Sequence, residues 1–242
     1  MPENFPTTND LEQGLSGSPP SLPSGAPRWF EVSFALLALI LTSPLLLLAI
    51  CAIALTRGPL LFRQERVGQG GRTFTLVKLR TMRAAREGSS VTARHDPRVT
   101  LPGRLLRLTK LDELPELWTV IKGDLALVGP RPEVPRYVDV EDPLWRRVLL
   151  VRPGITSPAS LELRNEEELL SRLPATERDE AYRSWLLRYK LARDLSYLEK
   201  RTWGSDLRVL ARTALLVALP RLAKAPQWEE IRRLVTSGGD RS

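Results

Sequence analysis

The stretch DPRVTLPGRLLRLTKLDELPELWTVIKGDLALVGPRPEVP, residues 96–135, places two adjacent carboxylates inside an apolar pattern with helical spacing. Within it, Pro115 suits the first turn of a helix that begins near Asp112 and ends at Gly123. Neighbouring residues on a helix project about 100° apart, so Asp112 and Glu113 can serve two separate roles around one small site. On local grounds alone, the pair also fits as an N-cap and a first-turn acid that stabilise the helix.

Asp112 has the chemistry of a nucleophile if the start of a helix keeps it ionised through the helix dipole. An ionised carboxylate can attack phosphorus, and it is also a hard oxygen ligand for Mg²⁺. Histidine occurs only at position 95 and cysteine only at position 51. A multi-histidine metal cluster and an internal disulfide framework are therefore excluded.

Three further motifs carry residues that could contact phosphate or sugar. Prolines on both sides of Arg131 stiffen its backbone and favour a phosphate contact, although a rigid turn with an exposed arginine fits equally well. Lys78 and Arg80 alternate at the end of an expected strand, where they could bind phosphate or lipid head groups or simply face solvent. Thr156 lies in a Gly- and Pro-rich loop that could contact a sugar or form an ordinary turn.

Residues 32–55 carry no charge, and these 24 mostly apolar residues are enough to span a bilayer as a helix. A cleaved signal peptide fits poorly because the run is too long and has little positive charge before it. Ser43-Pro44 interrupts the run, and a proline there removes a backbone hydrogen bond and bends the helix. The segment could therefore re-enter on one side or span as a kinked helix. Six basic residues between Arg57 and Arg80 predict that the C-terminal side is cytoplasmic.

The rest of the 242-residue chain suggests one compact domain with tails. We expect a β-hairpin around the glycines of residues 68–71, charged helices over 166–192, and a last apolar helix over 206–219. That last helix could pack on the core or lie in a membrane interface. The net charge of +8 suits anionic partners. Only this charge supports nucleic-acid binding, since no recognition-helix or aromatic stacking motif is present.

Taken together, these motifs resemble the bacterial sugar transferase family, the monotopic polyprenol-phosphate phosphoglycosyl transferases. The resemblance runs from about Arg28 to Thr213 and includes Ser43-Pro44 as the helix-breaking pair. Its other blocks are GPLLFRQERVGQGGRTFTLVKLRTMR (58–83), the quoted stretch 96–135, and RPGITSPASLELRNEEELL (152–170). The sequence departs from the common family pattern at Glu31, Leu79 and Ser157-Pro158, none of which touches the candidate nucleophile.

The resemblance implies a two-step reaction. Asp112 would attack the sugar-linked phosphate of a UDP-sugar and release UMP, and undecaprenyl phosphate would then take the sugar-phosphate. Glu113 matches the partner carboxylate and would share Mg²⁺ with Asp112 or handle a proton. Arg131 matches a phosphate-binding arginine. The other matching basic positions are Lys78, Arg80 and Arg107.

We therefore expect a mostly helical α+β protein, with a re-entrant membrane helix, a small β-hairpin and interfacial amphipathic helices around a cytosolic catalytic domain. The expected divisions are a disordered tail (1–27), the membrane helix (28–57), the catalytic domain (58–222) and a C-terminal tail (223–242). The expected location is the cytoplasmic face of the bacterial inner membrane, with membrane lipids and no nucleic acid as partners. The sequence leaves oligomeric state open, a homodimer included. A non-catalytic membrane scaffold is the rival function.

Overall fold

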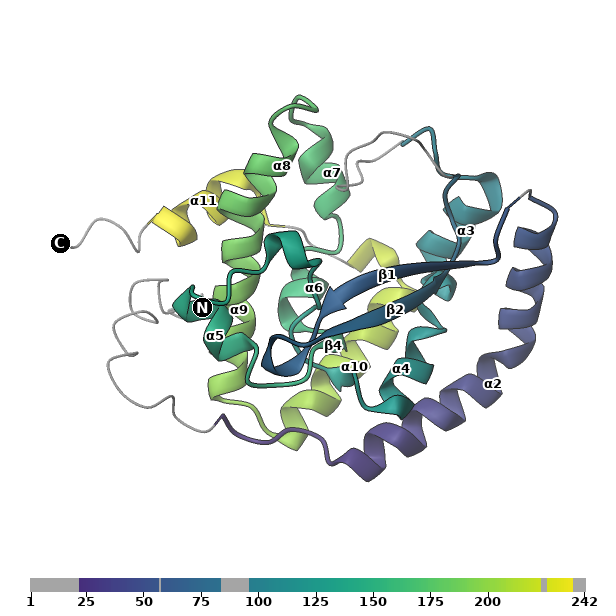
Figure 1. Ribbon diagram of the computed structural model, residues 1–242, viewed down its shortest axis with the longest axis horizontal. Coiled ribbons are helices and arrows are strands. Elements are labelled where there is room, and N and C mark those ends of the chain that lie inside the picture. Colours follow the sequence, from purple (N-terminus) through teal and green to yellow (C-terminus); the bar gives the residue numbers. More distant parts are fainter. Residues whose placement is uncertain (1–21, 57, 84–95, 223–225, 237–242) are drawn as a thin grey trace.

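The computed structural model describes residues 22–56, 58–83, 96–222 and 226–236, and this part of the chain is mostly helical (Figure 1). Its helices are α2 (Arg28–Ala54), α3 (Leu101–Thr109), α4 (Glu116–Lys122), α5 (Pro143–Val148), α6 (Pro158–Glu162), α7 (Glu166–Ser171), α8 (Arg178–Ala181), α9 (Arg188–Glu199), α10 (Trp203–Ala218) and α11 (Trp228–Thr236). Its strands are β1 (Leu61–Val67), β2 (Thr73–Leu79), β3 (Ala126–Val128) and β4 (Gly154–Thr156). Single turns are η1 (Gln69–Gly71), η2 (Leu111–Glu113), η3 (Pro135–Tyr137), η4 (Tyr182–Leu187) and η5 (Pro220–Leu222).

The predicted β-hairpin is confirmed. Strands β1 and β2 are antiparallel, with Leu61 opposite Leu79 and Val67 opposite Thr73. Gly70 adopts a φ of 69° in the connecting turn, a left-handed conformation that favours glycine. A second, parallel pair of strands was not predicted: β3 and β4 each contain only three residues. This short pair joins segments on either side of α5 and fixes the loop that follows β3.

Helix α4 ends at Gly123 as predicted, where a φ of 106° closes the helix. It begins at Glu116 rather than near Asp112, because the residues before Pro115 form the separate η2 turn. Within the segment predicted as a C-terminal tail, the structure describes α11, whose Ile231 is fully buried. Most of the predicted N-terminal tail, residues 1–21, lies outside the described residues.

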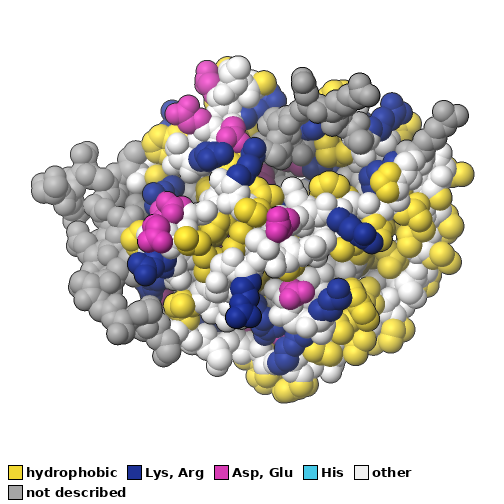
Figure 2. All heavy atoms as spheres, in the orientation of Figure 1, with side chains coloured by type: hydrophobic (Ala, Val, Ile, Leu, Met, Phe, Trp, Pro, Cys, Tyr) yellow, Lys and Arg dark blue, Asp and Glu magenta, His cyan; other side chains and the backbone are white. Residues whose placement is uncertain are grey.

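Helix α2 runs along one side of the molecule, and it is long and apolar enough to cross a membrane (Figure 1). Pro44 has no N–H to offer the Ile40 carbonyl, and the Ser43 hydroxyl donates a hydrogen bond to that oxygen instead at 2.8 Å. Hydrophobic side chains gather over α2 at the right-hand edge of Figure 2. Most of this helix is therefore unburied by the rest of the chain, as its composition predicts.

Both ends of α2 are attached to the same domain. Near its start, the Arg28 guanidinium donates to the Val120 carbonyl at 2.6 Å, and Glu31 pairs with Arg152 at 2.7 Å. Just beyond its end, Arg80 donates to the Thr56 carbonyl at 3.0 Å. Between these points α2 packs on α4, α3 and the η2 turn. Helix α2 therefore lies directly beside the turn that carries Asp112.

Two larger apolar clusters and one small cluster form the described core. One groups α5, α7, η4, α9 and α11, and the second groups α2, β2, α4, β3, α6 and α10. The small one joins the end of α2 to Leu79 and Leu106. The hairpin crosses the face between α2 and the α7–α9 helices in Figure 1. This arrangement brings the end of β2, the η2 turn and the loop after β3 to one place.

Candidate active site

Asp112 lies in the η2 turn between α3 and α4. Lys110 ends α3 with a left-handed φ of 59°, so the chain turns sharply just before the carboxylate. Asp112 is only 7% exposed, and its Oδ1 atom has no hydrogen-bond partner in the described part of the chain. Leaving a buried carboxylate oxygen unpaired costs folding free energy. Such an oxygen is a candidate for chemistry rather than for stability.

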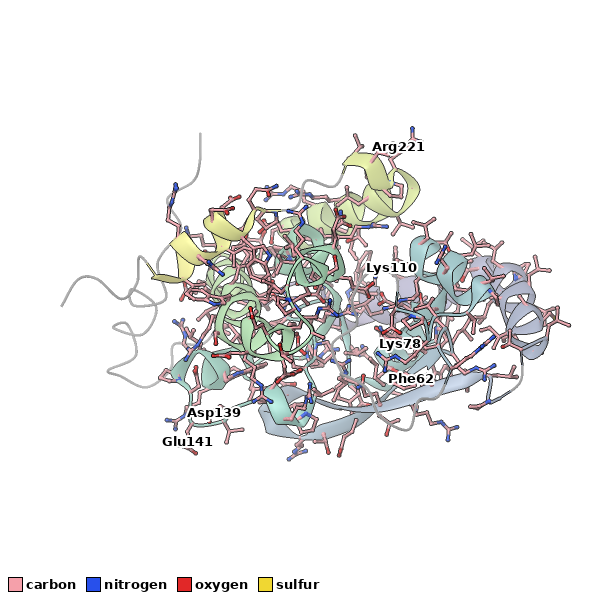
Figure 3. The ribbon with its side chains drawn as sticks, turned by 90° about the horizontal axis from the view of Figure 1, so that it is seen from above. Phe62, Lys78, Lys110, Asp139, Glu141 and Arg221 are labelled. Carbon is pink, nitrogen blue, oxygen red and sulfur yellow. The ribbon has the colours of Figure 1, made fainter. Side chains whose placement is uncertain are left out.

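Three cations converge on the next residue, Glu113. Its Oε1 atom lies 2.9 Å from Lys78 Nζ, 3.1 Å from an Nη atom of Arg131 and 3.6 Å from Lys110 Nζ. Lys78 is shared, since its Nζ also lies 3.0 Å from Glu116 Oε1. Figure 3 shows Lys78 and Lys110 near each other on the helical side of the hairpin, and the Lys110 side chain is 40% exposed. The site therefore gathers concentrated positive charge beside Asp112, as anionic substrates require.

The adjacent carboxyl groups have opposite electrostatic environments. Burial raises the pKa of Asp112 and the charge of Glu113 raises it further, while Lys78 and Lys110 oppose this without cancelling it. Burial also acts to raise the pKa of Glu113, but the charges of Lys78, Lys110 and Arg131 outweigh it and hold this pKa well below its usual range. Two carboxyl groups with separated pKa values can take different chemical roles.

This result corrects the expectation that a helix dipole keeps Asp112 ionised. Helix α4 starts only at Glu116, so Asp112 is not in its first turn. Burial dominates instead, and it favours the neutral acid. The cations around Glu113 therefore replace the dipole as the groups that favour ionised Asp112.

Arg131 is held by a stiff loop that begins at the end of β3. The Gly154 N–H donates to the Pro130 carbonyl at 2.9 Å, and the Arg66 guanidinium donates to the Pro132 carbonyl at 2.9 Å. Both prolines that flank Arg131 are therefore tied to neighbouring strands. The guanidinium reaches Glu113 from this fixed base. The predicted restriction of Arg131 by its neighbours has a clear structural counterpart here.

The other predicted basic residues take different positions. Arg107 ion-pairs with Glu167 of α7, and its charge acts to lower the pKa of Asp112. Arg80 falls just after β2 and donates to the Thr56 carbonyl, away from the Glu113 contacts of Lys78. Lys78 and Arg80 were expected on one strand face, but the strand ends between them and the two side chains bind different partners.

Thr156 and the Ser43-Pro44 pair lie in structural contacts. The Thr156 hydroxyl is buried and hydrogen-bonds the Thr213 hydroxyl of α10 at 2.8 Å. Ser43 and Pro44 remain in the middle of α2. Sequence reasoning missed Lys110 and Glu116, both described above, and Arg164, whose charge interacts with Glu113. For Glu116, the usable signal was its place three residues after Glu113, which is one helical turn.

Residues 24–219 match the model of a family described as bacterial sugar transferase. The chain belongs to the bacterial sugar transferase family. The match includes α2, the hairpin, the Asp112 turn, the Arg131 loop and α10. The resemblance found from the motifs is thereby confirmed. This member of the bacterial sugar transferases also has relatives whose activities are named.

The relatives of this bacterial sugar transferase carry different sugars in their names. The UDP-glucose:undecaprenyl-phosphate glucose-1-phosphate transferase of Caulobacter vibrioides is 38% identical over 193 residues, covering 77% of this chain and 67% of the relative. The undecaprenyl-phosphate galactose phosphotransferase of Salmonella typhimurium is 31% identical over 212 residues, covering 78% of this chain and 40% of the relative. The UDP-N-acetylgalactosamine-undecaprenyl-phosphate N-acetylgalactosaminephosphotransferase of Aeromonas hydrophila is 39% identical over 140 residues, covering 55% of this chain and 33% of the relative. This chain therefore spans between one third and two thirds of their lengths.

A magnesium site in this transferase would have few protein ligands. The described residues contain no group of three or more acidic, histidine or cysteine side chains placed to hold a metal ion. Mg²⁺ commonly binds through one or two carboxylates together with substrate phosphates. The unpartnered Oδ1 of Asp112, with Glu113 beside it, fits this kind of site. Asp112 is therefore a suitable ligand once a diphosphate is bound, and Glu113 would become one after Lys78 and Arg131 turn to the diphosphate.

Proposed function

We propose that this transferase moves a sugar-1-phosphate from a UDP-sugar onto undecaprenyl phosphate and releases UMP. This would be the first membrane step in the synthesis of an exopolysaccharide, O-antigen or glycoconjugate. The observation that carries the proposal is a buried, unpartnered Asp112 oxygen next to a carboxylate that gathers three cations. The names of the relatives support the same donor and acceptor classes.

In the first step, an Asp112 oxygen attacks the phosphorus that bears the sugar. The bond from this phosphorus to the bridging oxygen breaks, and UMP leaves with the electron pair. In the second step, an oxygen of undecaprenyl phosphate attacks the same phosphorus and displaces Asp112, which regains its free carboxylate. A covalent intermediate divides one difficult transfer into two easier displacements.

The surrounding cations bind the donor diphosphate and the UMP leaving group. Lys78 and Arg131 are held by Glu113 at 2.9 and 3.1 Å, and they would turn towards phosphate oxygens when the donor binds. Glu113 would keep them in place between turnovers. Bound Mg²⁺ would further neutralise the charge on the diphosphate. Arg107, from the end of α3, would add charge near Asp112.

We place the catalytic domain on the cytoplasmic face of the inner membrane, with α2 re-entering from that face. The support is that residues at both ends of α2 bind the same domain, through Arg28 and Glu31 at one end and Thr56 at the other. A helix that crossed the bilayer would hold its ends on opposite sides. The exposed apolar side chains of α2 would then face lipid. This position brings Asp112 close to a lipid-linked acceptor.

The test is UMP release by the whole protein in detergent with Mg²⁺, undecaprenyl phosphate and a panel of UDP-sugars. We expect one or more donors to be turned over, and an intermediate trapped without acceptor to carry its mass on the Asp112 peptide. Asp112→Asn should lose UMP release while still inserting into membranes. A non-catalytic scaffold predicts that Asp112→Asn keeps full function. An adduct on another peptide would overturn the role of Asp112.

A further inference from the structure

Behind Arg131 lies a buried cluster of charged and polar side chains that the proposed reaction does not use. We call it the Lys190 cluster. It consists of Arg66 from β1, Glu133 from the loop after β3, Glu166 at the start of α7, Tyr182 at the start of η4, and Lys190 from α9. Five separate segments of the chain therefore meet through polar contacts. Burying this many charges needs a reason, because desolvation is costly.

Lys190 is the centre of the cluster. Its Nζ lies 2.7 Å from Glu166 Oε2 and 3.6 Å from Glu133 Oε1, and it donates to the Tyr182 hydroxyl at 3.1 Å. The Tyr182 hydroxyl in turn donates to Glu133 at 2.6 Å. Lys190 is 6% exposed and Glu133 is 5% exposed. Lys190 therefore neutralises the deeply buried Glu133 and the partly buried Glu166, whose side chain is 28% exposed.

The cluster adjoins Arg131. Arg131, Glu133 and Lys190 line the same small cavity, with about 10 Å³ of free volume, which is at most enough for one water molecule. The charges of Lys190, Arg131 and Lys110 act together on Glu166 and lower its pKa against the effect of burial. Glu166 thus contacts Lys190 directly and also lies within electrostatic range of two active-site cations.

We infer that Lys190 is a positioning residue, which holds the partly buried Glu166 carboxylate and thereby leaves Arg131 free to face the substrate diphosphate. This inference rests on the proposed function for one point, namely that the ligand of Arg131 is the substrate diphosphate. Without Lys190, the carboxylate of Glu166 would have Arg131 and Lys110 as the remaining cations that act on it. A partly buried carboxylate without a partner attracts the nearest cation. Arg131 would then turn from Glu113 and the substrate towards Glu166.

Two double variants of the full chain test this inference with matched changes in charge. Lys190→Met/Glu166→Gln removes one cation and the acid beside Arg131. Lys190→Met/Glu133→Gln removes the same cation and the other acid, so Glu166 stays charged and unpaired. The measurement is the Kd for inorganic diphosphate at fixed Mg²⁺, by titration calorimetry in detergent. The KM for the UDP-sugar and the kcat of UMP release are measured in parallel.

We expect the variant that keeps Glu166 to bind diphosphate about tenfold more weakly than the wild type, the size of one lost charge-assisted contact. Its KM should rise by a similar factor, with kcat changed less. The variant without Glu166 should stay within about threefold of the wild type. Lys190→Arg should also bind normally. Equal binding by the two double variants would overturn the inference. Equal weakening by Glu133→Gln alone would also overturn it, because that variant loses only the contacts of Glu133 with Arg66, Tyr182 and Lys190. Failure of the proposed function would appear separately, as wild-type protein that binds diphosphate but releases no UMP.

Discussion

At the scale of single residues, the site combines a carboxyl group that burial favours as neutral with a neighbour kept ionised by cations. Glu113 raises the pKa of Asp112 through its negative charge. Glu113→Gln removes that charge, while Lys78 keeps Glu116 as a partner and still acts on Asp112, so the pKa of Asp112 falls. We expect the acidic limb of kcat/KM for UMP release to move to lower pH, together with a fall in the maximum rate.

The control is Glu141→Gln, because Glu141 lies far from Lys78 and Lys110 in Figure 3. It removes the same charge from an exposed position, so its pH profile should match that of the wild type. A Glu113→Gln profile whose acidic limb stays in place, or moves to higher pH, would contradict the electrostatic account of Asp112.

Asp112 should also limit the stability of the fold. A raised pKa means that the native state binds the Asp112 proton more tightly than the unfolded chain does, so stability falls as pH rises through the interval between the two pKa values. At pH 7.5 Asp112→Asn removes this penalty. We expect Tm to increase by about 2–4 °C, which corresponds to about 1 kcal/mol in a domain of this size. The gain should vanish at low pH, where the carboxyl group is protonated in both states.

At the scale of elements, short-range patterns predicted the hairpin and the end of α4 because one or two glycines determine each. The strands β3 and β4 could not be predicted, since three residues are too few for a periodicity and their pairing joins distant segments. The residues of the site also separate into those that short-range patterns reveal and those that depend on long-range contacts. The Asp112-Glu113 pair and the proline-flanked Arg131 were visible in the sequence. The partners of Arg80 and Thr156, and the whole Lys190 cluster, depend on contacts between distant segments.

In α2, which continues as one helix through Pro44, the missing N–H of this proline gives Ser43 a specific role. The Ser43 hydroxyl donates to the Ile40 carbonyl, which receives no backbone hydrogen bond because Pro44 has no N–H. The Thr42 hydroxyl donates to the Ala38 carbonyl at 2.6 Å. We expect Ser43→Ala to cost about 1 kcal/mol, because in lipid the Ile40 oxygen has no water to replace the bond. Thr42→Val should cost less, since the N–H of residue 42 can still serve Ala38. Thermal unfolding in detergent micelles and in lipid nanodiscs would compare the two, and an equal loss in both variants would contradict the role of Ser43.

At the scale of the whole molecule, a helix of membrane-spanning length is attached by both ends to one folded domain. If α2 crossed the bilayer, the contacts of Arg28 and Glu31 with the domain would have to form on the opposite side from those of Thr56. Glu31 is 1% exposed, with Arg152 at 2.7 Å and the Leu127 N–H as partners in the domain, and a spanning helix would lose both contacts. We therefore expect α2 to re-enter the membrane rather than span it.

Cysteine labelling provides the direct test of topology. In a Cys51→Ser background, a single cysteine replaces either Ser24, which is exposed before α2, or Asp124, which is exposed after α4. We expect a membrane-impermeant maleimide to label both positions in inverted membrane vesicles and neither position in intact spheroplasts. This result follows because both sites belong to a domain held on one side by the contacts of Arg28, Glu31 and Arg80. Labelling of Ser24→Cys in intact spheroplasts would mean that α2 spans the membrane and that its N-terminal contacts with the domain do not form in the bilayer.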